Sequence, residues 1–132
     1  MSDITYKSYD TSLQGMKRTL EENGVAVVPN IFTHEECVKY RDNIWKELKH
    51  VMKDRFDISK PETWREFYTL YPLHSMLLQH FSLGHMQPIW DIRQNEKVCD
   101  IFCKIWDCKK EDLIVSFDGL SVHLPPEDTR KG

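Results

Sequence analysis

The sequence predicts an α+β fold that is predominantly helical, with its β-strands gathered near the C-terminal end. Three observations lead to this prediction. Apolar residues recur at intervals of three and four over most of the chain, which is the period of an amphipathic helix. Residues that favour strands are concentrated in one stretch, 113–124. The length of 132 residues and the hydrophobic content of 40% fit one folded domain, so we expect a single domain over 1–132 with flexible ends at 1–11 and 127–132.

The first predicted elements are a short helix and a buried strand. Three leucine and methionine residues share one face of a helix over 12–23, and Gly24 ends it because glycine accepts the left-handed conformation. The run Val-Ala-Val-Val at 25–28 is rich in β-branched residues and predicts a strand. Pro29 closes this strand because it has no amide hydrogen to donate.

The longest predicted helix begins with a capping box. The Thr33 hydroxyl is expected to accept from the Glu36 amide, while the Glu36 carboxylate accepts from the Thr33 amide. Apolar residues then continue at helical spacing to about Asp54. A second, shorter helix is expected with Pro61 at its first position, and it must end before Pro72.

Shorter helices and then strands complete the prediction. We expect one or two helical turns within 73–81, and helix over 87–107 with Asn95 as the N-cap of its second part. The stretch 113–124 predicts strands, interrupted by Asp118-Gly119. That dipeptide is typical of either a tight hairpin turn or a bulge.

Composition argues against several classes of partner. The 18 basic and 21 acidic residues give a net charge of −3, which does not predict a nucleic-acid or anionic membrane surface. The N-terminus lacks a signal peptide, and no apolar run reaches the ~18 residues of a membrane-spanning helix. We therefore expect a cytoplasmic protein with no membrane or nucleic-acid partner, whose four cysteines are reduced thiols: Cys37, Cys99, Cys103 and Cys108.

Two groups of residues are candidate metal ligands, each with a simpler alternative. Cys99 and Cys103 lie four apart on a predicted helix and could hold a soft metal, but no second ligand pair stands at zinc-site spacing. Small buried hydrophobes are the alternative. His74, His80 and His85 are spaced by six and five, which matches neither a helical nor a strand face. We therefore predict no catalytic and no metal-binding residue in this chain. A helical metal-binding protein that uses these cysteines and histidines is an alternative function.

Two further groups have competing interpretations. The aromatic residues at 64–71 could line an organic-substrate pocket, but at helical spacing they more often fill a core; they are Trp64, Phe67, Tyr68 and Tyr71. The run 46–55 mixes both charges, which favours a solvated helix face over a nucleic-acid site.

Two segments together resemble a known family. The stretch 22–36, ENGVAVVPNIFTHEE, resembles the opening of phytanoyl-CoA dioxygenase-like proteins, in which a helix, a strand with a turn, and an acid-capped helix follow one another. The stretch 116–126, SFDGLSVHLPP, resembles the strand that such proteins place before their metal site. The resemblance therefore brackets the chain from about Leu13 to Pro126.

This resemblance implies an oxygenase that uses Fe(II) and 2-oxoglutarate, built on a double-stranded β-helix, or jelly roll, with helices outside it. Such an iron centre takes two histidines and one carboxylate, two of them from a His-x-Asp pair on a strand. No His-x-Asp pair occurs in this sequence, and the residue two positions after His123 is Pro125. His34-Glu35-Glu36 lies at a helix start, where the three side chains do not share a face.

We therefore expect the N-terminal part of such an oxygenase, inactive alone, with 113–124 as the first strands of an incomplete jelly roll. Whether the chain itself is an enzyme is left open. No cofactor is expected for the chain alone. The alternative is a non-catalytic helical interaction module derived from such a gene. In either case, the strand edge at 113–124 could pair with a second copy or with the missing half of the barrel.

Overall fold

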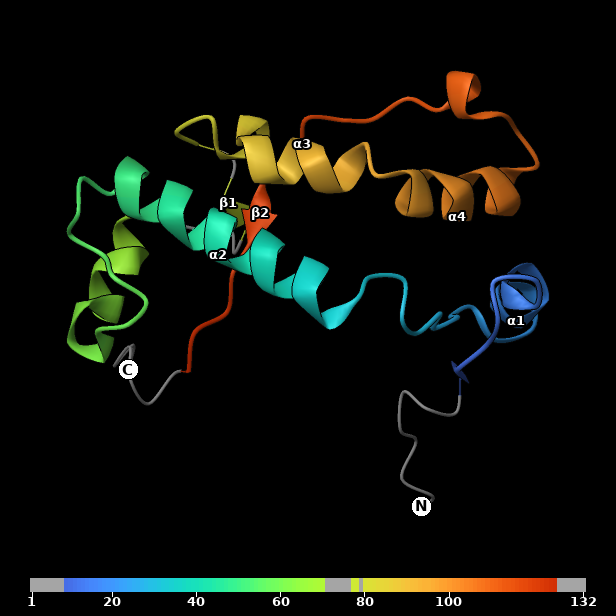
Figure 1. The fold of residues 1–132 in the computed structure, drawn as a ribbon, viewed down its shortest axis with the longest axis horizontal. Helices are drawn as coiled ribbons and strands as arrows, with labels where there is room; N and C mark the ends of the chain where they lie inside the picture. The colour runs from blue at the N-terminus through green and yellow to red at the C-terminus, as the bar shows by residue number, and fades with distance from the viewer. Residues whose placement is uncertain (1–8, 71–76, 79, 126–132) are drawn as a thin grey trace, which may run out of the picture. The chain divides into compact units, whose positions relative to one another are not determined.

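The computed structural model describes residues 9–70, 77–78 and 80–125, and these residues are mainly helical, as predicted (Figure 1). They form two compact units. Unit 1 lies within 1–36 and 93–114, and unit 2 within 37–92 and 115–132. The prediction of a single domain stays a prediction. Most of the two predicted flexible ends lies outside the described residues.

Unit 1 consists of short helices with little buried surface. α1 (Met16–Asn23) packs against α4 (Glu96–Trp106), which is followed by η4 (Lys110–Asp112). In Figure 1, α1 is seen almost along its axis while α4 lies across the view, so the two helices cross steeply. Asn95 caps α4 as predicted, accepting from the Lys97 amide at 2.9 Å. Among the described residues of this unit, Met16 is the one buried hydrophobic side chain.

The strand predicted at 25–28 is reduced to a single bridge. Gly24 ends α1 in the left-handed conformation with a φ of 74°, as predicted, and its amide donates to Leu20. Val27 then forms an isolated parallel bridge with Asp10: the Val27 amide donates to Tyr9, and the Thr11 amide donates to Val27, each at 2.9 Å. Among the described residues, only Tyr9 to Thr11 pair with this run, so no longer ladder forms.

α2 (His34–Val51) begins with the predicted capping box. The Thr33 amide donates to the Glu36 carboxylate at 2.7 Å, and the Glu36 amide donates to the Thr33 hydroxyl at 3.2 Å. The helix ends earlier than Asp54, because Lys53 and Asp54 both adopt left-handed backbone angles. The start and type of this helix are therefore confirmed.

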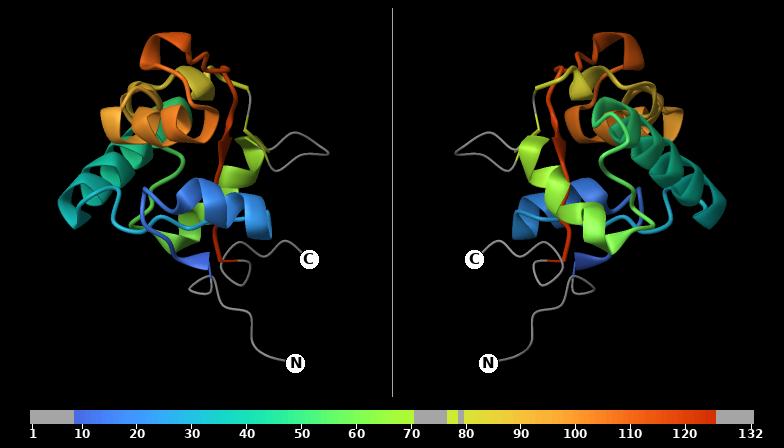
Figure 2. Two further views of the ribbon diagram at one scale, coloured as in Figure 1. Left: turned by 90° about the vertical axis from the view of Figure 1, so that its right-hand side faces the viewer. Right: turned by 90° about the vertical axis from the view of Figure 1, so that its left-hand side faces the viewer.

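Unit 2 contains the hydrophobic core. This unit includes α2 from Cys37 on, and a connection that both views of Figure 2 show leads from α2 to a 3-10 helix, η2 (Pro61–Leu70). Two short helices, η3 (Leu83–His85) and α3 (Gln87–Arg93), come later in the chain. Pro61 begins η2 as predicted. The buried core residues come from these helices, from the segments that connect them, from β1 (Leu77–Leu78) and from the residue after β2 (Leu120–Ser121): Leu48, Met52, Phe56, Phe67, Leu70, Leu78, Leu83, Met86, Ile89 and Val122.

The described sheet is one short antiparallel pair. β1 (Leu77–Leu78) pairs with β2 (Leu120–Ser121), with Leu77 opposite Ser121 and Leu78 opposite Leu120. Within the predicted stretch 113–124, only Leu120 and Ser121 are in a strand, and residues 113–119 are not. Of the two alternatives for Asp118-Gly119, the tight hairpin is not formed, because β2 pairs with a segment distant in sequence. Tertiary packing overrides strand propensity here, because β2 is placed by the core contacts of Val122 and Leu78.

The helix predicted within 73–81 is also wrong where it can be compared. Leu77 and Leu78 are in a strand, and Phe81 and Ser82 have left-handed angles with φ of 57° each. Residues 73–76 and 79 lie outside the described residues. The buried Leu78 side chain joins the core from an extended backbone, a conformation that the spacing of apolar residues alone does not reveal.

Candidate functional site

The predicted histidine candidates contact different partners. His80 meets Phe81 edge to face at 6.4 Å between ring centroids, whereas His85 stacks on Phe117 at 4.8 Å. His74 lies outside the described residues. His123 shares a hydrogen bond of 3.1 Å between its Nε2 and the Ser121 hydroxyl. Within 9–70, 77–78 and 80–125, no three His, Cys, Asp or Glu side chains lie close enough to hold one metal ion.

An aromatic cluster of His85, Trp90 and Phe117 is the feature of unit 2 that sequence reasoning missed. Phe117 stacks on His85 with an interplanar angle of 23° and meets Trp90 edge to face at 5.2 Å. Phe117 is nonetheless 62% exposed. No periodic pattern predicts this cluster, because it joins a residue of the irregular stretch 113–119 to residues of η3 and α3.

Gly84 allows this aromatic cluster to form. A Cβ atom at position 84 would lie 2.3 Å from the carbonyl oxygen of Asp118 and 3.4 Å from that of Phe117. Only glycine leaves room for the backbone of 117–118 to approach so closely. The close approach places the Phe117 ring beside His85 and Trp90.

The aromatic residues predicted at 64–71 pack into the interior where they are described. Phe67 is 1% exposed and its ring centroid lies 5.2 Å from that of Phe56. Trp64 packs against the core and donates its indole hydrogen to the Ile58 carbonyl at 3.1 Å. Tyr71 lies outside the described residues. These contacts favour the core interpretation over a substrate pocket for Trp64 and Phe67.

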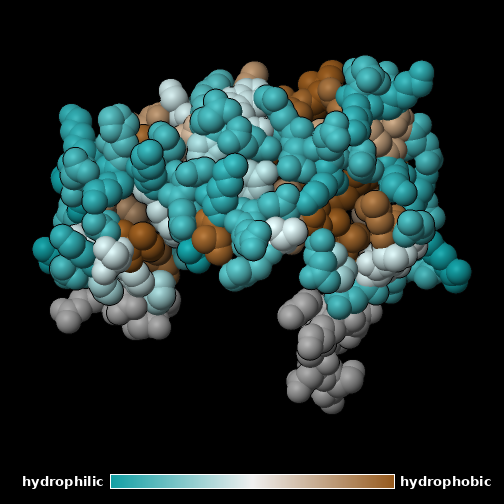
Figure 3. All heavy atoms as spheres, in the orientation of Figure 1, coloured by the Kyte–Doolittle hydropathy of each residue, from teal (hydrophilic) through white to brown (hydrophobic). Residues whose placement is uncertain are grey.

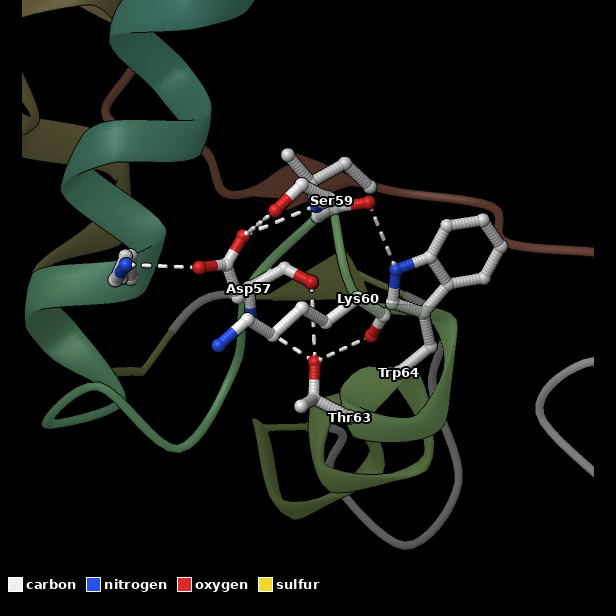
Figure 4. A network of polar contacts seen from close by, with 7 residues as sticks. Asp57, Ser59, Lys60, Thr63 and Trp64 are labelled. Atoms are coloured by element: carbon white, nitrogen blue, oxygen red, sulfur yellow. Dashed lines mark hydrogen bonds and ion pairs between the residues drawn. The ribbon is translucent and has the colours of Figure 1, made fainter.

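A network of polar contacts around Asp57 fixes the connection between α2 and η2 (Figure 4). One carboxylate oxygen of Asp57 accepts from the Ser59 hydroxyl at 2.6 Å and from the Ser59 amide at 3.0 Å. The other oxygen accepts from the Lys49 ammonium at 2.9 Å. The Thr63 hydroxyl also accepts from the Asp57 amide at 3.0 Å.

These contacts lower the pKa of Asp57 well below its ordinary value. The Ser59 hydroxyl makes the largest contribution and Lys49 the next, because both stabilise the charged carboxylate. Both oxygens already have protein partners, so the network has the features of a structural turn. Asp57-x-Ser59 is the local sequence signal that could have predicted it, since aspartate side chains often accept from the amide two residues on.

The first turn of α2 carries a second charged contact, within unit 1. The Lys97 ammonium lies 2.7 Å from both Glu36 carboxylate oxygens and 5.8 Å from the centre of the Phe32 ring. Lys97 is the largest cause of a lowered Glu36 pKa, followed by the backbone hydrogen bond from Thr33. Glu36 therefore serves both the capping box and a link to the start of α4.

All four cysteines are free thiols. Cys37 is exposed, whereas Cys99, Cys103 and Cys108 are half-buried in unit 1. The Cys99 thiol donates to the Arg93 carbonyl at 3.6 Å. Burial is the main cause of a raised Cys103 pKa, and Cys108 adds to it by charge and by a side-chain hydrogen bond.

Several large hydrophobic side chains are exposed. On the face drawn in Figure 3, hydrophilic residues predominate and hydrophobic ones reach the surface in separate areas. Ile114 is 97% exposed, and Trp106 of α4 is 70% exposed. No residue of α4 is fully buried, although its apolar residues follow helical spacing.

Comparisons of the chain with family models, curated proteins and solved structures found no match. In the part of the chain that the structure describes, no helix combines the length and the apolar content that crossing a bilayer requires.

Proposed function

We propose that this chain is the N-terminal part of a phytanoyl-CoA dioxygenase-like oxygenase that uses Fe(II) and 2-oxoglutarate. The supporting observation is the order of local structures from Met16 to Val51. α1 ends at a left-handed Gly24, an isolated bridge at Val27 follows, and the capping box of Thr33 and Glu36 begins α2. The resemblance of 22–36 to this family rests on the same order of helix, extended segment and capped helix.

The described residues do not fit the iron centre that the family implies. Such a centre takes two histidines and a carboxylate on one face of the metal, and the described side chains bring no such group of three together. The sequence also contains no His-x-Asp pair. We therefore assign no step of the reaction to this chain and expect it to be inactive alone.

In the proposal, the chain has a structural role. The core of unit 2 holds β2 through Val122, with Leu120 and Leu124 packed against the same cluster. In the proposal, β2 is one of the first strands of a jelly roll, and the helices form the layer outside it. A cytoplasmic location goes with the proposal, because all four cysteines are free thiols and the cytosol keeps thiols reduced.

The experiment that tests the proposal begins with the coding DNA beyond the Gly132 codon, read in all three frames. We expect it, or another coding region of the same transcript, to encode a His-x-Asp pair and a later histidine. Co-expression of that polypeptide with this chain should yield succinate from 2-oxoglutarate when Fe(II) and O2 are supplied. Each part assayed alone should yield none. The absence of any such coding sequence would overturn the proposal.

A second, independent experiment uses the chain alone. Anaerobic titration with Fe(II) and 2-oxoglutarate should give no visible charge-transfer absorption, because the ligands are missing. Stoichiometric iron held by the isolated chain would contradict the proposal.

A second candidate function is a non-catalytic interaction module. The observation that favours it is the exposure of apolar side chains in the irregular stretch 113–119, above all Ile114 at 97%. Pairing of this stretch with a second copy, or with a separate barrel half, would cover such residues. Size-exclusion chromatography with light scattering tests this role: a stable dimer or heteromer supports it, and a monomer or an irregular aggregate contradicts it.

A further inference from the structure

The C-terminal end of α4 brings two cysteines together in a specific turn. The amides of Asp107 and Cys108 both donate to the Cys103 carbonyl oxygen, the latter at 3.1 Å. Asp107 has the left-handed angles φ 51° and ψ 45°. A helix that ends with a left-handed residue and a hydrogen bond closing six residues has a Schellman-type turn. In that turn, Cys103 and Cys108 occupy the two positions whose side chains commonly touch.

We propose that Cys103 and Cys108 form a reversible intramolecular disulfide, so that this turn is an oxidation site of the protein. The backbone hydrogen bond of 3.1 Å holds the two Cα atoms within about 7 Å of each other, given ordinary bond lengths. Disulfides join Cα atoms that are usually about 4.4–6.8 Å apart. The turn therefore brings the two cysteines close to bonding distance without a change of fold.

The surroundings of the pair favour this bond over the alternatives within unit 1. Both thiols are half-buried, so small oxidants can reach them. Cys99 lies four residues before Cys103 on the regular part of α4, and its thiol already donates to the Arg93 carbonyl. A bond between Cys99 and Cys103 would have to form within a continuous helix, whereas Cys108 folds back over the helix end.

The step needs a two-electron oxidant, for which we name a low-molecular-weight disulfide such as oxidised glutathione. The Cys108 thiolate attacks one sulfur of the oxidant, forming a mixed disulfide and expelling one small thiolate. The Cys103 thiolate then attacks the Cys108 sulfur and expels the second small thiolate. The protein loses two electrons and two thiol protons, and the two leaving groups take up those protons as small thiols.

The position of the pair also predicts how the site behaves. Thiolates are stabilised at helix N-termini, and this pair lies at the opposite end of α4. The raised pKa of Cys103 agrees with its role as the second, resolving thiol. We therefore expect a disulfide that forms slowly and is reduced slowly, because a thiol with a raised pKa is a poor leaving group.

The experiment uses the full chain, incubated with oxidised glutathione, blocked with an alkylating reagent and digested with trypsin without reduction. Lys104 separates the two cysteines, so trypsin releases them in the fragments 98–104 and 105–109. We expect these two fragments to remain linked, and the intact monomer to lose two hydrogens. A loop within 98–104, a bond between two chains, or glutathione adducts that never resolve would overturn the proposal.

Serine variants identify the sulfur atoms. The linked fragments should persist in Cys99→Ser and in the control Cys37→Ser, and should be lost in Cys108→Ser. Cys103→Ser should instead accumulate a stable glutathione adduct on Cys108. Loss of the linked fragments in Cys99→Ser would show that Cys99 supplies one of the sulfurs and would contradict the assignment.

Two variants of Asp107 test the turn itself. Asp107→Gly and Asp107→Val both remove the carboxylate that pairs with Lys17, but only valine penalises the left-handed conformation. That penalty of about 1–2 kcal/mol corresponds to about a tenfold slower closure of the disulfide in Asp107→Val than in Asp107→Gly. Equal closure rates would show that the turn does not direct the reaction.

Discussion

Gly84→Ala is the substitution that tests the geometry of unit 2 most directly. The new Cβ atom would lie 2.3 Å from the Asp118 carbonyl oxygen, and ordinary contact begins at 3.4 Å. The backbone at 117–118 must therefore retreat by about 1.1 Å, the difference of these distances. The neighbouring atoms are backbone, so no side chain can simply turn aside.

The expected cost has two parts. Overpacking of a close backbone contact costs about 1–3 kcal/mol. A shift of Phe117 also weakens its contacts with His85 and Trp90, and an aromatic pair contributes about 0.5–1.5 kcal/mol beyond the area it buries. We therefore expect Gly84→Ala to lower the free energy of unfolding by about 2–4 kcal/mol.

Urea unfolding followed by circular dichroism measures this loss. Gly15→Ala is the matched control, because its Cβ would meet the end of the Thr11 side chain, which can rotate away. That variant should stay within about 1 kcal/mol of the parent chain. Phe117→Leu completes a double-mutant cycle, in which Gly84→Ala should cost less when the aromatic contacts are already gone. A Gly84→Ala chain as stable as the Gly15→Ala control would refute the close approach.

Three other predictions concern separate features. Thr33→Ala should lower the free energy of unfolding by about 1 kcal/mol, because it removes one bond of the capping box; urea unfolding checks this, and an unchanged midpoint would contradict the cap. The lowered pKa of Asp57 means that its contacts stabilise the fold above the ordinary carboxyl pKa, and that this contribution is lost as the pH falls towards the folded value. The unfolding midpoint of the parent chain should therefore fall more steeply than that of Asp57→Asn between about pH 4 and about pH 2, and parallel curves would argue against the network. Ile114→Ser should change the free energy of unfolding by less than about 0.5 kcal/mol, because the side chain is 97% exposed, yet it should weaken any self-association seen by light scattering if the second candidate function is correct.

Local signals in the sequence were sufficient to predict most helices. The capping box at Thr33, the N-cap at Asn95 and the glycine at position 24 each act through atoms a few residues apart. Such contacts depend little on the rest of the fold, so their residue types reveal them directly. Helix α2 and helix α4 were predictable for this reason.

Leu120 and Ser121 lie in the stretch predicted as strand, but the strand pairing was not predictable because it depends on distant residues. β2 pairs with β1, and nothing in either two-residue segment specifies the other. The stretch 113–117 is rich in strand formers, but Ile114 and Phe117 remain largely exposed and form no ladder. Strand propensity expresses how well a side chain fits a pleated, half-buried surface, and in the described part of the chain no strand pairs with this stretch.

The aromatic cluster of unit 2 and the cysteine pair of unit 1 were the least predictable features. Phe117, His85 and Trp90 come together only because Gly84 admits the backbone of Asp118. In the sequence, Cys103 and Cys108 are two thiols five residues apart, but their close approach depends on the left-handed angles of Asp107. The sequence indicated a turn or a bulge at Asp118-Gly119, whereas the close backbone approach occurs at Gly84.

The residues after Gly119 connect the core to the proposed oxygenase fold. Leu120, Val122 and Leu124 all belong to the hydrophobic cluster, whereas Ser121 and His123 are exposed and share a hydrogen bond. This alternation has the period of two that a strand with one buried face requires. The alternation of buried and exposed side chains extends to Leu124, beyond the two residues that pair with β1. In the proposal, a second strand would pair beside this segment, whose apolar side chains already pack on the core. The same alternation directs His123 away from the core. We therefore expect His123→Ala to leave both the stability of the chain and the activity of any reconstituted oxygenase unchanged, and loss of that activity in a folded variant would show that His123 contributes to the site.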